Sequence, residues 1–160
     1  LSASRVTTPA APADRPLPPG VAPAPARPDG AYLAFDAFAD WGIRAIATTR
    51  ATGSFASESD EPVRAVTARW AALHAWCAPD PERLRFATAR QVHAATVLAH
   101  GPDWRGWLRA PAADGHLALA RGTACAVTVA DCVPVYVAHP SGAIAMLHSG
   151  WRSTEAGILG

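Results

Sequence analysis

Two stretches near the C-terminal end of the sequence carry side chains that could bind a metal ion. Asp131 and Cys132 follow one apolar run, and residues 148–152 (His-Ser-Gly-Trp-Arg) follow another. They supply a thiol, an imidazole and two charged groups at the ends of expected strands, where protein scaffolds usually place chemistry. Thiolate and imidazole are among the preferred ligands of zinc. The sequence therefore points to metal binding at these strand ends.

The elements that must position these residues are three apolar runs of strand length, bounded by polar or turn residues. They span residues 124–129, 133–138 and 143–147. Residues 139–142 (His-Pro-Ser-Gly) join the last two runs and have the proline and glycine that a three-residue hairpin loop favours. Such a hairpin pairs Pro134 with His148 and sets Cys132 diagonal to His148, roughly 7–8 Å away at the backbone. One ion could then bridge Cys132 and His148, whereas a slip of one residue would separate them.

The composition limits the class of protein. A length of 160 residues, half of them apolar, suits one domain with a real core. A formal net charge of +1 gives no electrostatic case for binding nucleic acid or an anionic membrane. No apolar run approaches the roughly 20 residues that span a bilayer, and no signal segment opens the chain. The three cysteines do not fit a disulfide framework, which fits a reducing compartment. We expect a cytoplasmic monomer without nucleic-acid or membrane partners.

The pattern divides the chain into a tail and one domain. Residues 1–30 are rich in alanine, hold eight of the fifteen prolines and have almost no bulky apolar side chains. This composition predicts a disordered tail or linker, with a Pro-rich ligand for an SH3-like partner as the alternative. Residues 31–160 are expected to form a metal-binding domain. Because Gly160 falls inside a helix expected to start near Ser153, we expect this domain to be truncated at its C-terminus.

Local patterns in the rest of the domain predict an α+β fold. The expected elements are a strand over 43–49, a loop over 51–61, a helix over 63–77, a strand over 84–89 and a surface loop over 101–115. β-Branched residues favour the first strand, apolar residues at helical spacing favour the helix, and glycines and prolines favour the last loop. We expect mixed or antiparallel sheets whose faces are covered by this helix and the one near Ser153.

Three short motifs carry a resemblance to a known family. Gln91-Val92-His93, Ala130-Asp131-Cys132-Val133-Pro134 and His148-Ser149-Gly150-Trp151-Arg152 resemble the QxHG, ADCxP and HAGWRG motifs of the YfiH-like family. Its members were once called multicopper polyphenol oxidoreductases or laccase-domain proteins and are now described as purine nucleoside phosphorylases. The order and spacing match over roughly residues 41–159. Together the three motifs are specific, although each alone would be weak.

The resemblance implies a metal site on His93, Cys132 and His148. Three protein ligands leave a fourth position for water or substrate, which is the pattern of catalytic zinc sites. We therefore expect Zn²⁺, with Cu²⁺ as the alternative ion. The competing interpretation makes Cys132 a small buried residue and each histidine a core or loop residue. Cys77 and Cys125 are expected in the core.

The resemblance also implies a site for phosphate and a nucleoside. Arg50 and Arg152 are the candidates for phosphate, because guanidinium matches phosphate oxygens bidentately. Asp131 could orient a ligand or a hydroxyl, or cap the turn before Cys132, and Gln91 could hold the nearby motif histidine or a substrate. We assign Cys132, Asp131 and Arg50 to catalysis, and Gln91 and Arg152 to substrate binding.

Several positions depart from the family pattern or lie outside it. Ala94, Ser149 and Ser153 stand where the motifs have Gly, Ala and Gly. Trp151 is expected to be a core anchor, with the wall of a base-stacking site as the alternative. Four histidines match no family ligand, and we expect them on the surface or in loops: His74, His100, His116 and His139.

The activity implied by the resemblance is metal-dependent phosphorolysis of adenosine, inosine and S-methyl-5'-thioadenosine, with deamination of adenosine as a second activity. A polyphenol oxidase is one alternative, but a single His-Cys-His set is too small for a multicopper cluster. A peptidoglycan-editing hydrolase would use Cys132 as a nucleophile and need no metal. The non-enzyme alternative is a zinc-stabilised domain that has lost catalysis.

Overall fold

The computed structural model describes residues 32–77, 80 and 83–160, so the tail predicted over residues 1–30 lies outside the described residues. The described chain is α+β, as predicted. No helix in these ranges is long and apolar enough to cross a membrane. The elements are β1 (Tyr32–Phe35), the 3-10 helix η1 (Asp36–Trp41), β2 (Ala45–Thr48), the 3-10 helix η2 (Arg50–Thr52), α1 (Val63–Cys77), β3 (Arg85–Ala89), β4 (Val97–His100), β5 (Gly106–Ala110), β6 (Gly115–Ala118), β7 (Thr123–Cys125), β8 (Val133–Ala138), β9 (Ile144–Ser149) and α2 (Trp151–Glu155).

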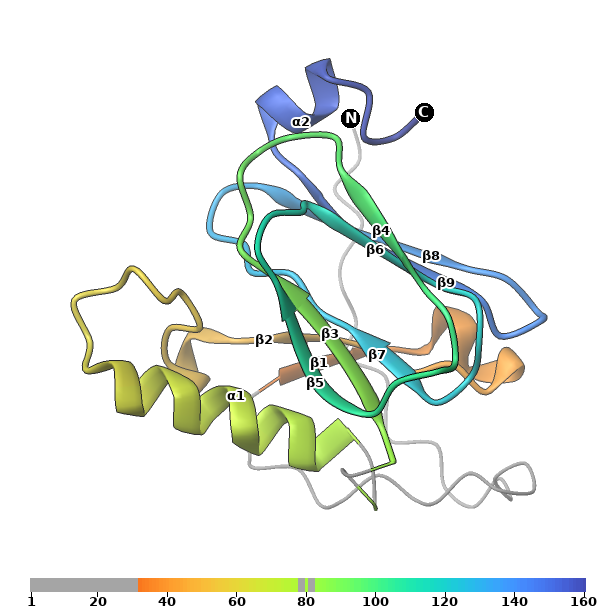
Figure 1. Ribbon diagram of the computed structural model, residues 1–160, viewed down its shortest axis with the longest axis horizontal. Helices are drawn as coiled ribbons and strands as arrows, with labels where there is room; N and C mark the ends of the chain where they lie inside the picture. Colours follow the sequence, from red (N-terminus) through yellow and green to blue (C-terminus); the bar gives the residue numbers. More distant parts are fainter. Residues whose placement is uncertain (1–31, 78–79, 81–82) are drawn as a thin grey trace, which may run out of the picture.

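The described strands form three sheets (Figure 1). β1 and β2 are an antiparallel pair, and β5-β3-β7 is parallel throughout. The third sheet, β4-β6-β9-β8, joins one parallel contact to two antiparallel ones. Figure 1 shows α1 along the lower edge of the molecule and α2 at the upper end. The predicted mixture of strand directions is therefore present.

Helix α1 packs its apolar stripe against the parallel sheet. The ring centroid of Trp70 lies 5.9 Å from those of Phe86 on β3 and Trp107 on β5. Phe86 is only 1% exposed, and burial of such a side chain stabilises a fold by roughly 1.5–3 kcal/mol. The predicted helix over residues 63–77 and its core-facing role are confirmed.

The hairpin of β8 and β9 has the predicted register. Gly142 adopts a left-handed φ of 98°, and its N–H donates to the carbonyl of His139 at 2.9 Å. Pro134 pairs with His148. Cys132, two residues before Pro134, is therefore diagonal to His148 on the same face of the sheet. The turn thus sets the register that brings Cys132 and His148, two of the three candidate metal ligands, to one face.

Three predictions about the strands were wrong. Residues 101–115, predicted as a surface loop, contain β5, which pairs in parallel with β3. The indole N–H of Trp107 donates to the hydroxyl of Thr88 at 2.9 Å. This pairing comes from a distant strand and needs no local alternation in the sequence. The run 124–129 stays in a sheet only to Cys125, and β1 precedes the strand that was expected to be the first.

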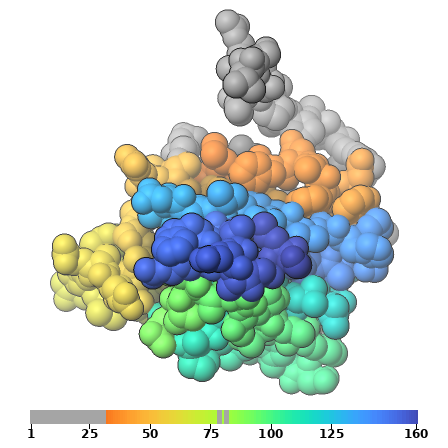
Figure 2. Space-filling view, turned by 90° about the horizontal axis from the view of Figure 1, so that it is seen from above, coloured from red at the N-terminus to blue at the C-terminus, as the bar shows by residue number. Residues whose placement is uncertain are grey.

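Helix α2 is short and follows β9 directly. Gly157, with a φ of 85°, ends it: its N–H donates to the carbonyl of Thr154 at 3.0 Å, and the N–H of Ile158 donates to that of Ser153 at 2.9 Å. These two bonds are the pattern of a Schellman motif. The prediction of a helix that starts near Ser153 and contains Gly160 was therefore wrong, because α2 spans only Trp151–Glu155 and is too short to cover a sheet face. Figure 2, seen from above, shows this C-terminal segment in dark blue at the centre of the upper face.

Four side chains lie elsewhere than predicted. His74, expected at the surface or in a loop, is half-buried in α1, with its ring centroid 5.3 Å from that of Phe86. His100 and His116, expected at the surface, are 5% and 1% exposed, with Nε2 of the first 2.9 Å from Nδ1 of the second. Burial lowers the pKa of both imidazoles, to about 4 for His116, where the neighbouring His100 adds to the effect. Near neutral pH they are therefore uncharged core residues, His100 on β4 and His116 on β6. Trp151, expected in the core, is 71% exposed because it opens α2 beyond the sheet.

Candidate metal centre

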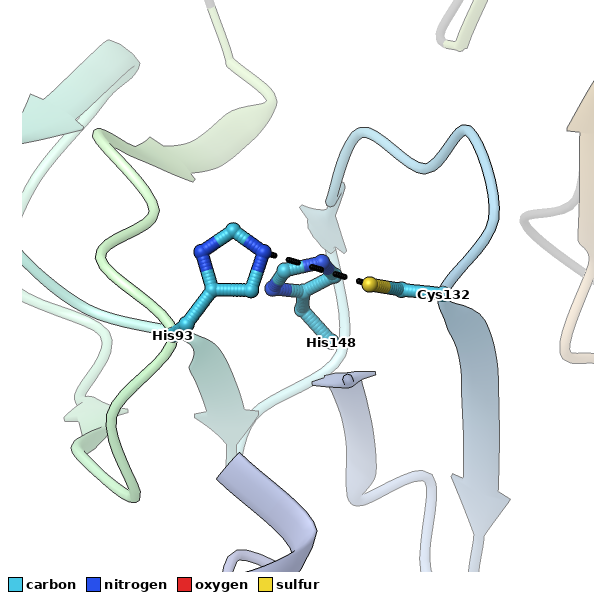
Figure 3. Close-up of side chains that lie close together, drawn as sticks. All are labelled: His93, Cys132 and His148. Atoms are coloured by element: carbon cyan, nitrogen blue, oxygen red, sulfur yellow. Dashed lines mark hydrogen bonds between the residues drawn. The ribbon is translucent and has the colours of Figure 1, made fainter. Parts of the chain in front are cut away.

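Three elements bring the predicted ligands together (Figure 3). His93 lies in the loop after β3, Cys132 directly precedes β8, and His148 lies on β9. One ligand atom from each residue lies within 4.8 Å of the other two. Sγ of Cys132 is 3.9 Å from Nε2 of His93. His93 and Cys132 are 39 residues apart in the sequence, and His148 lies on the strand that pairs with β8. The fold thus brings all three side chains to one place.

The three donors match the ligand preference of zinc, and Cys132 and His93 also approach the spacing that the ion requires. Zinc bonds of about 2.1 Å to nitrogen and 2.3 Å to sulfur separate two tetrahedral ligands by about 3.6 Å, a few tenths less than the 3.9 Å between Sγ of Cys132 and Nε2 of His93. Gly150 makes the approach possible. A Cβ at this position would lie 2.9 Å from Sγ of Cys132 and 3.1 Å from Cδ2 of His93. The glycine of the third motif therefore leaves room for the sulfur and the imidazole.

Asp114 lies beneath the site and is fully buried. Its Oδ1 is 2.9 Å from Nδ1 of His148 and accepts from the N–H of His93 at 2.9 Å. Its Oδ2 accepts from the N–H groups of Val92 at 3.2 Å and Ala94 at 2.8 Å. Burial pushes the pKa of this carboxyl upward, but the hydrogen bonds from His148 and the three backbone amides outweigh it, so the pKa lies below its usual value. Asp114 is thus a carboxylate held beneath the metal ligands.

Sequence reasoning missed Asp114. The signal was weak, because one acidic residue between Ala113 and Gly115 has the composition of an ordinary solvent-exposed turn. Its role follows from pairing: β6 and β9 are antiparallel with Gly115 opposite Leu147, which sets Asp114 opposite His148. The N–H of His148 also donates to the carbonyl of Asp114 at 2.7 Å.

A cleft of about 860 Å³ has the three ligands in its wall, a size typical of small-molecule sites. Arg50 and Asp131 also line it, and both are exposed. Arg152 is exposed outside this lining, with its guanidinium carbon 5.0 Å from the centroid of the Trp151 ring. The structure therefore places Arg50 and Asp131 in the lining of the same cleft as the three candidate ligands and leaves Arg152 outside it.

Gln91 also lines the cleft, and its amide is engaged with the backbone. Nε2 of Gln91 donates to the carbonyl of Thr128 at 2.7 Å, and its Oε1 accepts from the N–H of Thr128 at 2.6 Å. This pair of bonds ties the loop after β7, which leads to Cys132, to the loop that carries His93. The amide therefore holds Thr128 in the structure and not the imidazole of His93.

Ser153, one of the departures from the motif pattern, has a structural role here. Its hydroxyl is fully buried, accepts from the N–H of Gly150 at 2.8 Å and donates to the carbonyl of His148 at 2.9 Å. These bonds satisfy backbone groups at the turn from β9 into α2. The substitution thus stabilises the turn without touching the imidazole of His148.

The fold and the site define an α+β domain with an open His-Cys-His centre, and comparison with known proteins identifies the family. The multi-copper polyphenol oxidoreductase laccase family matches residues 48–160. This covers more than half of the chain, which therefore belongs to that family. The YfiH-like resemblance inferred from the three motifs is confirmed.

Curated relatives carry a different activity in their names. A purine nucleoside phosphorylase of Pseudomonas aeruginosa is 32% identical over 141 residues, covering 81% of this chain and 53% of that protein. The purine nucleoside phosphorylase YlmD of Geobacillus stearothermophilus is 35% identical over 83 residues, or 48% of this chain and 30% of that protein. The purine nucleoside phosphorylase YfiH of Escherichia coli is 44% identical over 70 residues, or 43% and 28%. The chain spans about half or less of the length of these relatives.

Proposed function

We propose that this chain carries the site of a metal-dependent purine nucleoside phosphorylase. The observation that supports this best is the convergence of His93, Cys132 and His148 in the wall of a cleft that also contains Arg50. The names of the three relatives supply the reaction class. We infer adenosine, inosine and S-methyl-5'-thioadenosine as substrates, and deamination of adenosine as a second activity.

Phosphorolysis breaks the glycosidic C–N bond and forms a C–O bond between phosphate and the anomeric carbon. The base leaves with a proton, and the sugar leaves as its 1-phosphate. Arg50 is the better candidate to hold phosphate, because its guanidinium can bind two oxygens at once and it lines the cleft. Arg152, proposed for the same role, is exposed outside that lining. Asp131 is proposed to orient a hydroxyl of the sugar.

Zinc held by His93, Cys132 and His148 would supply a Lewis acid that polarises an oxygen of the bound substrates. The remaining residues act by position. Gln91 contributes through its paired hydrogen bonds to Thr128, which fix the loop leading to Cys132. Holding the reacting groups in a near-attack geometry is the main source of rate that such a cleft can provide.

The test is phosphate-dependent release of hypoxanthine from inosine by zinc-loaded protein. We expect release that requires phosphate, together with formation of ribose 1-phosphate. Cys132→Ala should abolish it, whereas Cys125→Ala, at a half-buried cysteine of β7, should retain it. No release from the zinc-loaded chain, or release that ignores phosphate, would contradict the proposal.

One contact favours a second candidate, a hydrolase that uses Cys132 as its nucleophile. The 3.9 Å between Sγ of Cys132 and Nε2 of His93 is compatible with a thiol beside an activating imidazole. Such an enzyme needs no metal, so chelation should leave its activity intact. For the polyphenol oxidase alternative, residues 32–77, 80 and 83–160 contain one group of possible metal ligands, fewer than a multicopper cluster requires. Zinc binding without turnover would favour the non-catalytic domain.

A further inference from the structure

We propose that Asp114 is a positioning residue that preorganises the metal site before the ion binds. It does so by fixing the imidazole of His148 and the backbone of His93. The inference rests on the metal-binding part of the proposed function, and its test does not use turnover. Asp114 is fully buried, and each of its two carboxylate oxygens has two partners around the site.

The first action of Asp114 is on the tautomer of His148. With Oδ1 at 2.9 Å, Nδ1 of His148 carries the hydrogen and donates it to the carboxylate. Nε2 is then the unprotonated nitrogen, and it is the atom that remains for a metal. The N–H of His148 also donates to the carbonyl of Asp114 at 2.7 Å, so backbone and side chain hold His148 in one place. A carboxylate behind a ligand histidine fixes the tautomer and the orientation of its ring.

The second action is on the loop that carries His93. This histidine has a φ of 57°, and it is the non-glycine residue with a left-handed backbone among the described residues. A side chain in that region is strained and persists only where its surroundings over-determine it. The N–H groups of Val92, His93 and Ala94 all donate to the carboxylate of Asp114. The carboxylate therefore holds three consecutive amides, and the left-handed turn directs His93 toward Cys132 in Figure 3.

Only a carboxylate can serve all four donors. In Asp114→Asn, an NH₂ group replaces one acceptor oxygen. If the amide oxygen stays at the Oδ2 position, it keeps the N–H groups of Val92 and Ala94, and the NH₂ group faces both Nδ1 of His148 and the N–H of His93, which loses its acceptor. Nδ1 of His148 must then accept, so its proton moves to Nε2. The nitrogen meant for the metal becomes a donor, although the shape of the side chain is unchanged.

The test begins with the unmutated protein without metal. Long-range ¹⁵N–¹H spectra of the histidine rings report which nitrogen of His148 carries the proton. We expect protonated Nδ1 and unprotonated Nε2. The opposite tautomer would overturn the proposal, and this measurement does not depend on whether any variant folds.

Asp114→Asn should then move the proton of His148 to Nε2 and weaken zinc binding by about 10- to 100-fold. Ser153→Ala is the matched control, because it removes a buried hydroxyl that bonds the carbonyl of His148 and leaves the ring alone. It should lower stability without changing the tautomer. Equal zinc affinities in the two variants, with the tautomer unchanged, would reduce Asp114 to a purely structural role. Absence of phosphorolysis would leave this result untouched.

Discussion

Gly150 offers the sharpest perturbation of the candidate metal centre. In Gly150→Ala the added Cβ would lie 2.9 Å from Sγ of Cys132 and 3.1 Å from Cδ2 of His93. Ordinary contact begins at 3.4 Å, so the sulfur must retreat by about 0.5 Å (3.4 − 2.9). Ligand distances at a metal site tolerate only about 0.2 Å. The backbone itself is unstrained by the change, since Gly150 has a φ of −85°.

The cost should therefore appear in metal binding more than in folding. Without metal, Cys132 can move aside, because residues 129–131 directly before it are exposed and lie beyond the hydrogen bonds that hold Thr128. With metal bound, Cys132 cannot move, so the added methyl group overpacks the site at a cost of about 1–3 kcal/mol. This cost weakens zinc binding by roughly 5- to 150-fold. Competition with a chromophoric chelator measures this affinity, and thermal unfolding of the metal-free proteins measures stability. Gly101→Ala is the control, because nothing lies within 4 Å of the added Cβ. Equal zinc affinity in the two variants would refute the reasoning.

Three further predictions concern the reactivity of the cysteines, phosphate binding by the arginines and the buried histidine of β6. Chelation should increase alkylation of Cys132, because a metal-bound thiolate is shielded from the reagent. Cys125 should stay unreactive, since burial raises its pKa to about 12. Mass spectrometry of labelled peptides checks this, and equal labelling of Cys132 with and without chelator would count against the site. Arg50→Lys should raise the phosphate concentration needed for half-maximal turnover at constant metal content, and more so than Arg152→Lys; unchanged phosphate dependence in both would remove these residues from phosphate binding. The pKa of His116 in the fold is about 4, below its ordinary value of 6.5. The free energy of unfolding should therefore be highest above pH 6.5 and fall by up to about 3 kcal/mol as the pH falls towards 4. Urea unfolding over this range measures the loss, and the same pH dependence in His116→Phe would contradict the assignment to His116.

The site could be predicted where local chemistry fixes the geometry. Proline and glycine in residues 139–142 determine one loop, that loop determines the register, and the register brings Cys132 beside His148. His93 lies on a loop outside the sheets, so hydrophobic periodicity could not predict it as a metal ligand. That prediction rested on the resemblance of the three motifs. Helix α1 was predictable for a similar local reason, because its apolar residues repeat at helical spacing over fifteen residues.

What could not be predicted depends on pairing between distant strands. β5 has no alternating pattern of its own, and its place beside β3 decides its conformation. Asp114 looks like a turn residue until β6 is paired with β9, after which it lies beneath His148. His116 likewise became a core residue because β6 is an inner strand of its sheet. Sequence patterns give residue types and local turns, whereas these three roles arise from the topology.

Above all, we propose that His93, Cys132 and His148 hold one zinc ion. Metal analysis of protein purified without added metal tests it most directly, with Cys132→Ala and Cys125→Ala purified in parallel. We predict one zinc per chain in the unmutated protein and in Cys125→Ala, and loss of that zinc in Cys132→Ala. Equal metal content in all three proteins, or none in the unmutated chain even after zinc is supplied, would contradict the account.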